Sequence, residues 1–99
     1  MPQSLAQVYL HIIYSTKHRE PFLIDEHIRR EMHAYVASIV KAHGSHPFII
    51  GGTADHVHIL CTLPKTETYA KLIGEAKRNS SKWIKTKHGV EFDERYVWD

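Results

Sequence analysis

The first half of the chain alternates between a strand-like and a helix-like pattern of apolar residues. Residues 5–16 hold two interleaved sets of side chains that are both largely apolar, which predicts a strand covered on both faces. Residues 17–21 break this strand, and Asp25 then has the character of a helix N-cap. The apolar residues of the predicted helix recur at helical spacing up to a stop at Gly44: Ile28, Met32, Tyr35, Val36, Ile39 and Val40.

The middle of the chain predicts an antiparallel hairpin. Residues 47–52 form a short apolar stretch that ends in two glycines, and residues 56–63 alternate between two sets of side chains. The turn at residues 53–55 is short enough to join two neighbouring antiparallel strands. One face of the second hairpin strand carries Val57, Ile59, Cys61 and Leu63, and the other carries His56, His58, Leu60 and Thr62.

The last third of the chain predicts a long helix. Pro64 ends the preceding strand, and Thr66 or Thr68 caps a helix that runs to about residue 87. Its apolar stripe consists of Tyr69, Leu72, Ile73, Ala76, Trp83 and Ile84. Gly89 closes the helix, and the apolar residues after it indicate the start of another strand: Phe92, Tyr96, Val97 and Trp98.

This order of elements predicts an α+β fold of the ferredoxin-like, split βαβ type, with two helices on one face of an antiparallel sheet. A length of 99 residues fits one domain, and 42% hydrophobic with 24% charged residues excludes a disordered chain. No apolar run reaches the roughly 18–20 residues that span a bilayer. The N-terminus lacks the features of a secretory signal, and the single cysteine, Cys61, excludes an internal disulfide. These features predict a cytoplasmic protein with no membrane partner.

Positive charge is concentrated in the last predicted helix. Residues 65–88 carry seven basic and two acidic residues, a local net charge of +5 within an overall +2. The functional interpretation is contact with a phosphate backbone, and the alternative is an ordinary solvated helix face. The candidate phosphate contacts are Lys71, Arg78, Lys82 and Lys85, with Asn79, Ser80 and Ser81 adding neutral hydrogen bonds and with Lys17 and Arg19 as further DNA-binding candidates.

Nine histidines stand out in the composition, and two of them form a pair at strand spacing. His56 and His58 project from one face of the same predicted strand, roughly 6.5–7 Å apart. Two imidazoles so placed can converge on one divalent ion, and the alternative is a pair of polar residues on an exposed face. His11 is either a core histidine or a part of the same site. We expect His27, His33 and His43 on helix surfaces and Cys61 in the core.

Four segments of the sequence resemble the single-tyrosine transposases of the insertion sequence 200-like group. His56-Val57-His58 is similar to the HUH motif of that family, in which two histidines flank a bulky hydrophobic residue. The similarity covers the whole chain in matching order, with Ala54 in place of the usual proline. The other similar segments are Tyr14-Ser15-Thr16-Lys17-His18-Arg19-Glu20-Pro21-Phe22, Ala54-Asp55-His56-Val57-His58-Ile59-Leu60 and Lys77-Arg78-Asn79-Ser80-Ser81-Lys82-Trp83-Ile84.

The resemblance implies an enzyme of DNA transposition that cuts and rejoins single-stranded DNA at the ends of a mobile element. In such proteins a tyrosine attacks the phosphodiester and forms a 5′-phosphotyrosine linkage. The resemblance further implies a divalent ion, Mg²⁺ or Mn²⁺, held by His56 and His58. It also implies hairpin-forming single-stranded DNA as substrate and a homodimer as the working unit.

The family's nucleophile has no counterpart in these 99 residues. Tyr96-Val97-Trp98-Asp99 resembles the start of the segment that precedes the tyrosine helix in the family. The resemblance therefore places the nucleophile and the third metal ligand beyond Asp99. Residues 1–99 would then form a single transposase-like domain that lacks the tyrosine helix. None of the tyrosines here takes the expected position: Tyr9, Tyr14, Tyr35, Tyr69 and Tyr96. We expect Tyr35 and Tyr69 in the core.

Two other functions fit the same sequence. One is a non-catalytic module of ferredoxin-like fold that binds single-stranded nucleic acid. The other is a small metal-binding or regulatory domain without a DNA partner, which the basic segment 65–88 disfavours. A covalent protein–DNA adduct separates the enzyme from the first alternative, and the salt dependence of DNA binding separates it from the second.

Overall fold

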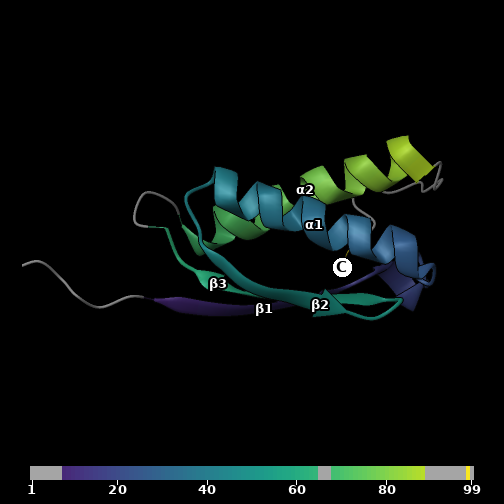
Figure 1. Ribbon diagram of the computed structural model, residues 1–99, viewed down its shortest axis with the longest axis horizontal. Coiled ribbons are helices and arrows are strands. Elements are labelled where there is room, and N and C mark those ends of the chain that lie inside the picture. The colour runs from purple at the N-terminus through teal and green to yellow at the C-terminus, as the bar shows by residue number, and fades with distance from the viewer. Residues whose placement is uncertain (1–7, 65–67, 89–97, 99) are drawn as a thin grey trace, which may run out of the picture.

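The part of the chain that the structure describes forms a three-stranded antiparallel sheet with two helices on it. The computed structural model describes residues 8–64, 68–88 and 98. The elements in chain order are β1 (Tyr9–Ser15), a 3₁₀ turn η1 (Lys17–Arg19), α1 (Glu26–Ala42), β2 (Pro47–Gly52), β3 (His56–Thr62) and α2 (Tyr69–His88) (Figure 1). The strand order is β1-β3-β2, so β3 is central and the predicted split βαβ arrangement is confirmed.

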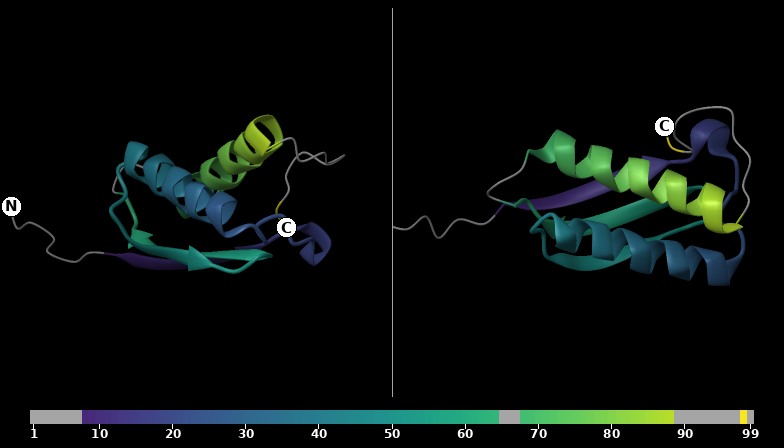
Figure 2. Two further views of the ribbon diagram at one scale, coloured as in Figure 1. Left: turned by 45° about the vertical axis from the view of Figure 1, so that its right-hand side comes forward. Right: turned by 90° about the horizontal axis from the view of Figure 1, so that it is seen from above.

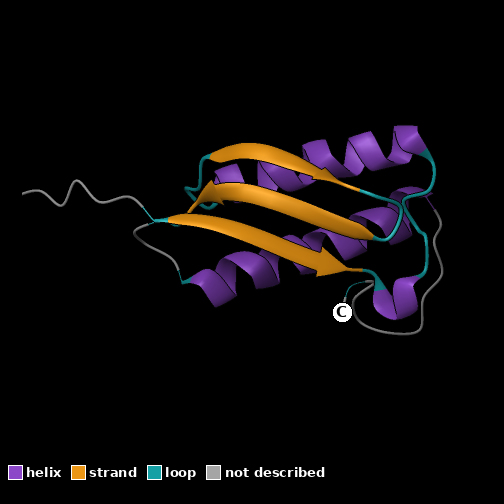
Figure 3. Cartoon of the chain, turned by 90° about the horizontal axis from the view of Figure 1, so that it is seen from below, coloured by secondary structure: helices purple, strands orange, loops and turns teal. Residues whose placement is uncertain are grey.

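Both helices pack on the same face of the sheet (Figures 1 and 2). Figure 3 views the other face, where no described helix lies in front of the strands. The prediction that the first strand is covered on both faces is therefore wrong. Ile12 and Tyr14 are buried under the helices, whereas Tyr9 and Ile13 on the open face are 60% and 58% exposed. Because both described helices lie on one face, the apolar residues of the other face remain open to solvent.

The core lies between the sheet and the helices. The predicted inward positions of α1 and β3 are confirmed, and Cys61 is fully buried. Tyr69 was placed in the core by its helical spacing, but it lies in the first turn of α2 and is 47% exposed. The core cluster contains Ile12, Tyr14, Leu23, Met32, Val36, Val40, Val57, Ile59, Cys61, Leu72, Ile84 and Trp98.

Side-chain caps fix both helix starts. The Asp25 carboxylate accepts hydrogen bonds from the backbone N–H groups of His27 (2.8 Å) and Ile28 (3.1 Å), as its predicted N-cap role requires. The Thr68 hydroxyl accepts from the N–H of Lys71 at 3.1 Å, so Thr68 is the cap of α2. Thr66 lies outside the described residues. Within the described residues, no helix is both long and apolar enough to cross a membrane.

Trp98 ties the end of the chain to the core. It forms an antiparallel bridge with Thr16, and its indole N–H donates to the Ser80 hydroxyl at 2.8 Å. Its ring meets Tyr14 edge-on, with the centroids 4.8 Å apart. Trp98 therefore lies beside the end of β1, on the side away from β3. The rest of the predicted final strand, including Phe92, Tyr96 and Val97, falls outside the described residues.

Gly52 shapes the hairpin between β2 and β3. Its φ of +151° is a conformation that residues with a side chain rarely adopt. A Cβ atom there would collide with the backbone carbonyl oxygen of His56, which accepts a hydrogen bond from the N–H of Thr53 at 3.0 Å. Gly51 has open space around its Cβ position. Position 52 therefore excludes a side chain, whereas position 51 has room for one.

We expect Gly52→Ala to lower the free energy of unfolding by roughly 1–3 kcal/mol, because it forces strain into the hairpin turn. Gly51→Ala is the matched control, and it should change stability by no more than about 0.5 kcal/mol. Urea denaturation of both variants measures the difference. Equal stabilities for the two variants would contradict the turn geometry described above.

Candidate functional site

Two histidines of the central strand point to the open face of the sheet. His56 and His58 are both half-buried, and their ring centroids lie 4.9 Å apart. The ring of His11, on the neighbouring strand β1, lies 5.6 Å from that of His58. The predicted placement of His56 and His58 on one strand face is thus observed. His11 is exposed on the same face, so it lines this site and is not a core histidine.

The histidine pair borders two hollows of the open face. The larger has a volume of about 500 Å³ and extends across β3 towards β2. The smaller, of about 260 Å³, lies towards the end of β1. His11, Ile49, Gly51, Gly52, Thr53, His56, His58 and Leu60 line the first, and Ile13, Tyr14, Ser15, Arg19, His56 and His58 line the second. A ligand in either hollow would meet both histidines of β3.

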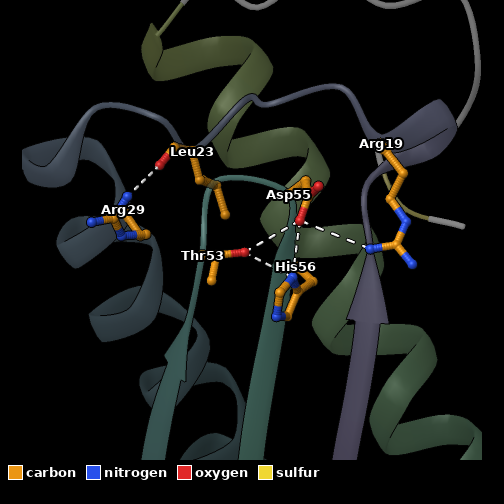
Figure 4. Close-up of polar contacts among 6 residues, drawn as sticks. All are labelled: Arg19, Leu23, Arg29, Thr53, Asp55 and His56. Carbon is orange, nitrogen blue, oxygen red and sulfur yellow. Dashed lines mark hydrogen bonds and ion pairs between the residues drawn. The ribbon is translucent and has the colours of Figure 1, made fainter.

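The hairpin turn holds His56 in one orientation (Figure 4). His56 Nδ1 lies 2.9 Å from Asp55 Oδ1 and 2.7 Å from Thr53 Oγ1. The Thr53 hydroxyl donates to the same Asp55 oxygen at 3.2 Å. Because a carboxylate only accepts hydrogen bonds, this network assigns the proton of His56 to Nδ1. Nε2 then keeps its lone pair, which is the arrangement of a histidine that binds a metal through Nε2.

Arg19 reaches the same corner from the turn that follows β1. Its Nη1 lies 3.9 Å from Asp55 Oδ1, with the side chain 68% exposed (Figure 4). The backbone holds the two segments together, because Thr16 N–H donates to the Asp55 carbonyl at 2.8 Å and Leu23 N–H donates to the Ala54 carbonyl at 2.9 Å. The Leu23 carbonyl in turn accepts from the Arg29 guanidinium at 3.0 Å. The turn after β1 therefore places a cation beside the histidine pair.

These contacts lower the pKa of the Asp55 carboxyl below its ordinary range. The main cause is the hydrogen bond from His56, with further contributions from Thr53 and the charge of Arg19. Asp55 thus stays ionised around neutral pH and continues to accept the hydrogen bond from His56 Nδ1.

His33 on α1 was expected on the helix surface, but it is half-buried. Burial is the main cause that lowers its pKa, and the charge of Arg29 lowers it further.

The cationic residues of α2 lie on the other side of the molecule. Lys71, Arg78 and Lys82 are exposed and Lys85 is half-buried, as their stripe predicts. Arg78 forms an ion pair with Glu75 one turn earlier. Since α2 packs on the inner face of the sheet, this stripe and the histidine pair lie on opposite sides of the sheet (Figures 1 and 3). Lys17, half-buried at the start of η1, lines neither hollow.

Two of the polar residues assigned to phosphate contacts are instead buried. Ser80 and Ser81 are 0% and 1% exposed. The Ser80 hydroxyl donates to the Ala76 carbonyl at 2.6 Å and accepts from the Trp98 indole, so it is a core contact. The amide of Asn79 donates to the Glu75 carbonyl at 2.9 Å. The hydroxyl of a mid-helix serine can bond to its own backbone, which is why helical spacing alone gave the wrong role.

The described residues hold neither a complete metal site nor a tyrosine hydroxyl beside the histidines. No group of three or more His, Cys, Asp or Glu side chains among them could hold a metal ion. The Tyr14 hydroxyl lies beside Ser80 under α2, where burial raises its pKa. Tyr9 is at the far end of β1, paired with Thr62. Tyr35 is half-buried and stacked on Trp83, and Tyr96 lies outside the described residues.

Sequence reasoning missed two residues of this site and ranked a third too low. It gave Thr53 and Asp55 no role, although Asp55 directly precedes the histidine pair and is the natural partner for His56 Nδ1. It ranked Arg19 below the lysines of α2, because the approach of η1 to the hairpin turn depends on tertiary structure. The only local signal for Arg19 is its place just after the strand.

Fold and site together define a ferredoxin-like protein with paired histidines on its open sheet face. The family model described as "Transposase IS200 like" matches residues 4–99. The chain therefore belongs to the IS200-like transposase family, whose members move mobile DNA elements. No curated protein matches the chain significantly. A crystal structure of a protein from Deinococcus radiodurans R1, assigned as a transposase, superimposes with a TM-score of 0.80 at 18% identity. The superposition covers 90% of this chain and 68% of the Deinococcus chain, which supports the fold.

Proposed function

We propose that this protein is an HUH-type transposase that binds hairpin-forming single-stranded DNA and exchanges its strands through a phosphotyrosine intermediate. The observation that carries this proposal is the histidine pair on the open sheet face, with His56 fixed by Asp55. Its place in a chain of the IS200-like family connects that pair to DNA. The two hollows beside the pair leave room for a DNA backbone.

The donor set fits part of a divalent metal site. His56 has its Nε2 lone pair left for a ligand, and His58 lies next to it on the same face. Imidazole nitrogens bind Mn²⁺ and tolerate Mg²⁺ beside oxygen ligands. A bound ion would polarise the scissile phosphate and offset the negative charge that develops there. We place the remaining ligands outside the described residues, because those residues offer no third one.

The chain's own residues would orient the DNA around this point. Arg19, at the rim of the smaller hollow, can pair with a phosphate oxygen next to the scissile bond. In the proposed reaction a tyrosine oxygen bonds to phosphorus and the 3′ oxygen leaves, so the phosphotyrosine bond conserves the energy needed for rejoining. We place the nucleophile outside the described residues, as we do the remaining metal ligands.

The positions of the α2 stripe and of the open sheet face suggest how the DNA would run. The stripe on α2 would hold the phosphates of a hairpin stem, and the open sheet face would hold the single strand that is cut. Because these surfaces lie on opposite sides of the sheet, a DNA molecule that contacts both has to pass around an edge of the sheet. A homodimer would offer a second route, in which the stem lies on one protomer and the cut strand on its partner.

One observation favours the alternative of a non-catalytic module that binds single-stranded nucleic acid. Within the described residues the histidine pair has no third ligand and no tyrosine hydroxyl beside it. Such a module would use the same sheet face and helix stripe, and it would hold DNA without cutting it. A covalent protein–DNA adduct in the experiment described below would exclude such a module.

Divalent metal binding should depend on both histidines of β3. We expect His56→Ala or His58→Ala to abolish Mn²⁺ binding measured by calorimetry, because each removes half of the pair. Asp55→Asn should weaken binding by roughly 10- to 100-fold, because it loosens the orientation of His56. His27→Ala is the control, since His27 lies 81% exposed on α1. Parent-like affinity in His56→Ala would place the metal elsewhere.

Binding of hairpin DNA should become less salt-dependent when the α2 stripe is altered. Arg78→Ala and Lys82→Ala should each reduce the log–log slope by about 0.9, the value for one lost phosphate contact on a duplex stem. Stability should change by less than about 0.5 kcal/mol. Arg30→Ala is a matched control, because Arg30 is paired with Glu26 on α1 as Arg78 is with Glu75 on α2. An unchanged slope in the double variant would move the phosphates to another surface.

The test of the chemistry uses end-labelled hairpin DNA with Mn²⁺ on a denaturing gel. Residues 1–99 should bind the hairpin without forming a covalent adduct, because no described tyrosine presents its hydroxyl to the histidine pair. An in-line attack needs a positioned nucleophile. An adduct lost in Tyr96→Phe would identify Tyr96 as the nucleophile, and absence of hairpin binding would overturn the proposed function.

A further inference from the structure

We infer that the open sheet face carries a second DNA contact, a platform on which unpaired bases stack. We call it the aromatic platform, and it consists of Tyr9, Phe48 and His46. It lies at the end of the sheet away from Asp55 and the hairpin turn. This inference rests on the proposed function and specifies which part of the DNA that face meets.

The three rings of the aromatic platform are exposed and touch one another across the sheet. Tyr9 is 60% exposed and Phe48 is 48% exposed. Their centroids lie 5.7 Å apart with the planes tilted by 41°, and the His46 ring meets Phe48 edge-on at 4.6 Å. Tyr9 belongs to β1, and Phe48 belongs to β2, so the contact bridges both strands that flank β3.

A bulge in β2 brings Phe48 to this face. Pro47 is aligned with Cys61 and Ile49 with Leu60, so one extra residue, Phe48, is inserted in the pairing with β3. Without it, strict alternation would turn Phe48 towards the helices, since Ile49 already faces outward and is 65% exposed. The bulge therefore adds a second aromatic ring to the face that already carries Tyr9.

The backbone around the aromatic platform is held firmly. Tyr9 pairs with Thr62 of β3. On the other side, His46 N–H donates to the Thr62 hydroxyl at 2.8 Å, and the His46 carbonyl accepts from Thr62 N–H at 3.1 Å. The buried Ser45 hydroxyl donates to the Thr62 carbonyl at 2.6 Å. Rings on a fixed backbone lose little freedom on binding, which favours a stacked partner.

The charge of this face suits a nucleic acid more than a basic partner. Within the described residues, the outward side chains of the strands are aromatic, aliphatic, histidine or hydroxyl groups, with no carboxylate among them. The Asp55 carboxylate lies just before the start of β3 and is paired with His56 and Arg19. A phosphate backbone laid along the face therefore meets no unpaired negative charge, while its bases find aromatic rings to stack on.

The aromatic platform is continuous with the candidate site. Ile49 and Leu60, which line the larger hollow with the histidines, lie beside Phe48 at the bulge. From His58 to Thr62 the strand advances four residues, which is roughly 13 Å at about 3.3 Å per residue. A single strand with one phosphate at the histidines would thus place bases a few nucleotides away on the rings. These bases flank the bond proposed to be cut.

The test compares three variants with the parent on three DNA ligands. Tyr9→Ala/Phe48→Ala should weaken binding of an unpaired oligonucleotide by about tenfold or more and leave its salt slope unchanged. The double variant should bind a fully paired duplex, and a strand with abasic sites opposite the platform, as well as the parent does. Tyr9→Phe should retain parental affinity, because it keeps the ring. Ile24→Ala, at a 72% exposed position outside the strands, is the control for loss of surface hydrophobicity.

Each other outcome has a distinct meaning. If the parent binds the unpaired strand and Tyr9→Ala/Phe48→Ala binds it equally well, the platform is refuted while the proposed function stands. If the parent binds no DNA, the proposed function fails and the platform fails with it. If the double variant changes the association state in sedimentation but not DNA affinity, a second copy of the chain covers this face and the inference is overturned. Circular dichroism of each variant confirms that it is folded.

Discussion

The pairing of β3 on both of its edges is the constraint on which the rest of the structure depends. Because side chains alternate along a strand, this pairing puts Val57, Ile59 and Cys61 fully into the core and turns His56 and His58 to the opposite face. A slip of one residue would bury the imidazoles and expose the core. The hydrophobic core and the histidine pair are therefore fixed by the same hydrogen bonds, and neither can move without the other.

Most of the fold was readable from local sequence, because it is encoded by spacing and by caps. The helical stripe of α1, the Asp25 cap and the strand alternation of β3 each depend on residues close together in the chain. The open face of β1 was not predictable in this way. Two interleaved apolar sets are typical of a strand buried on both sides, and nothing in the local pattern shows that Tyr9 and Ile13 lie where no helix covers them.

The candidate site was predictable in its histidine pair but not in the surroundings of that pair. His56 and His58 are separated by a single residue, so strand geometry alone puts them together. The hydrogen bond from His56 to Asp55 and the approach of Arg19 depend on how the turn after β1 folds against the hairpin, which is a long-range contact. Buried Ser80 illustrates the same limit, since its partners are a helix carbonyl and a tryptophan 18 residues away.

Within one short segment of α2, the buried residues Ser80 and Ser81 can be replaced less freely during evolution than the exposed residues beside them. Their neighbours Arg78 and Lys82 project into solvent, so replacing either cation leaves the packing intact. The serines are different, because Ser80 joins α2 to Trp98, and a larger side chain would have no space. The pattern of exposed charge can therefore drift from one mobile element to another, one residue at a time, while the scaffold beneath it stays the same. Under the proposed function, such a division between a variable surface and a fixed interior would let the stripe follow diverging DNA ends.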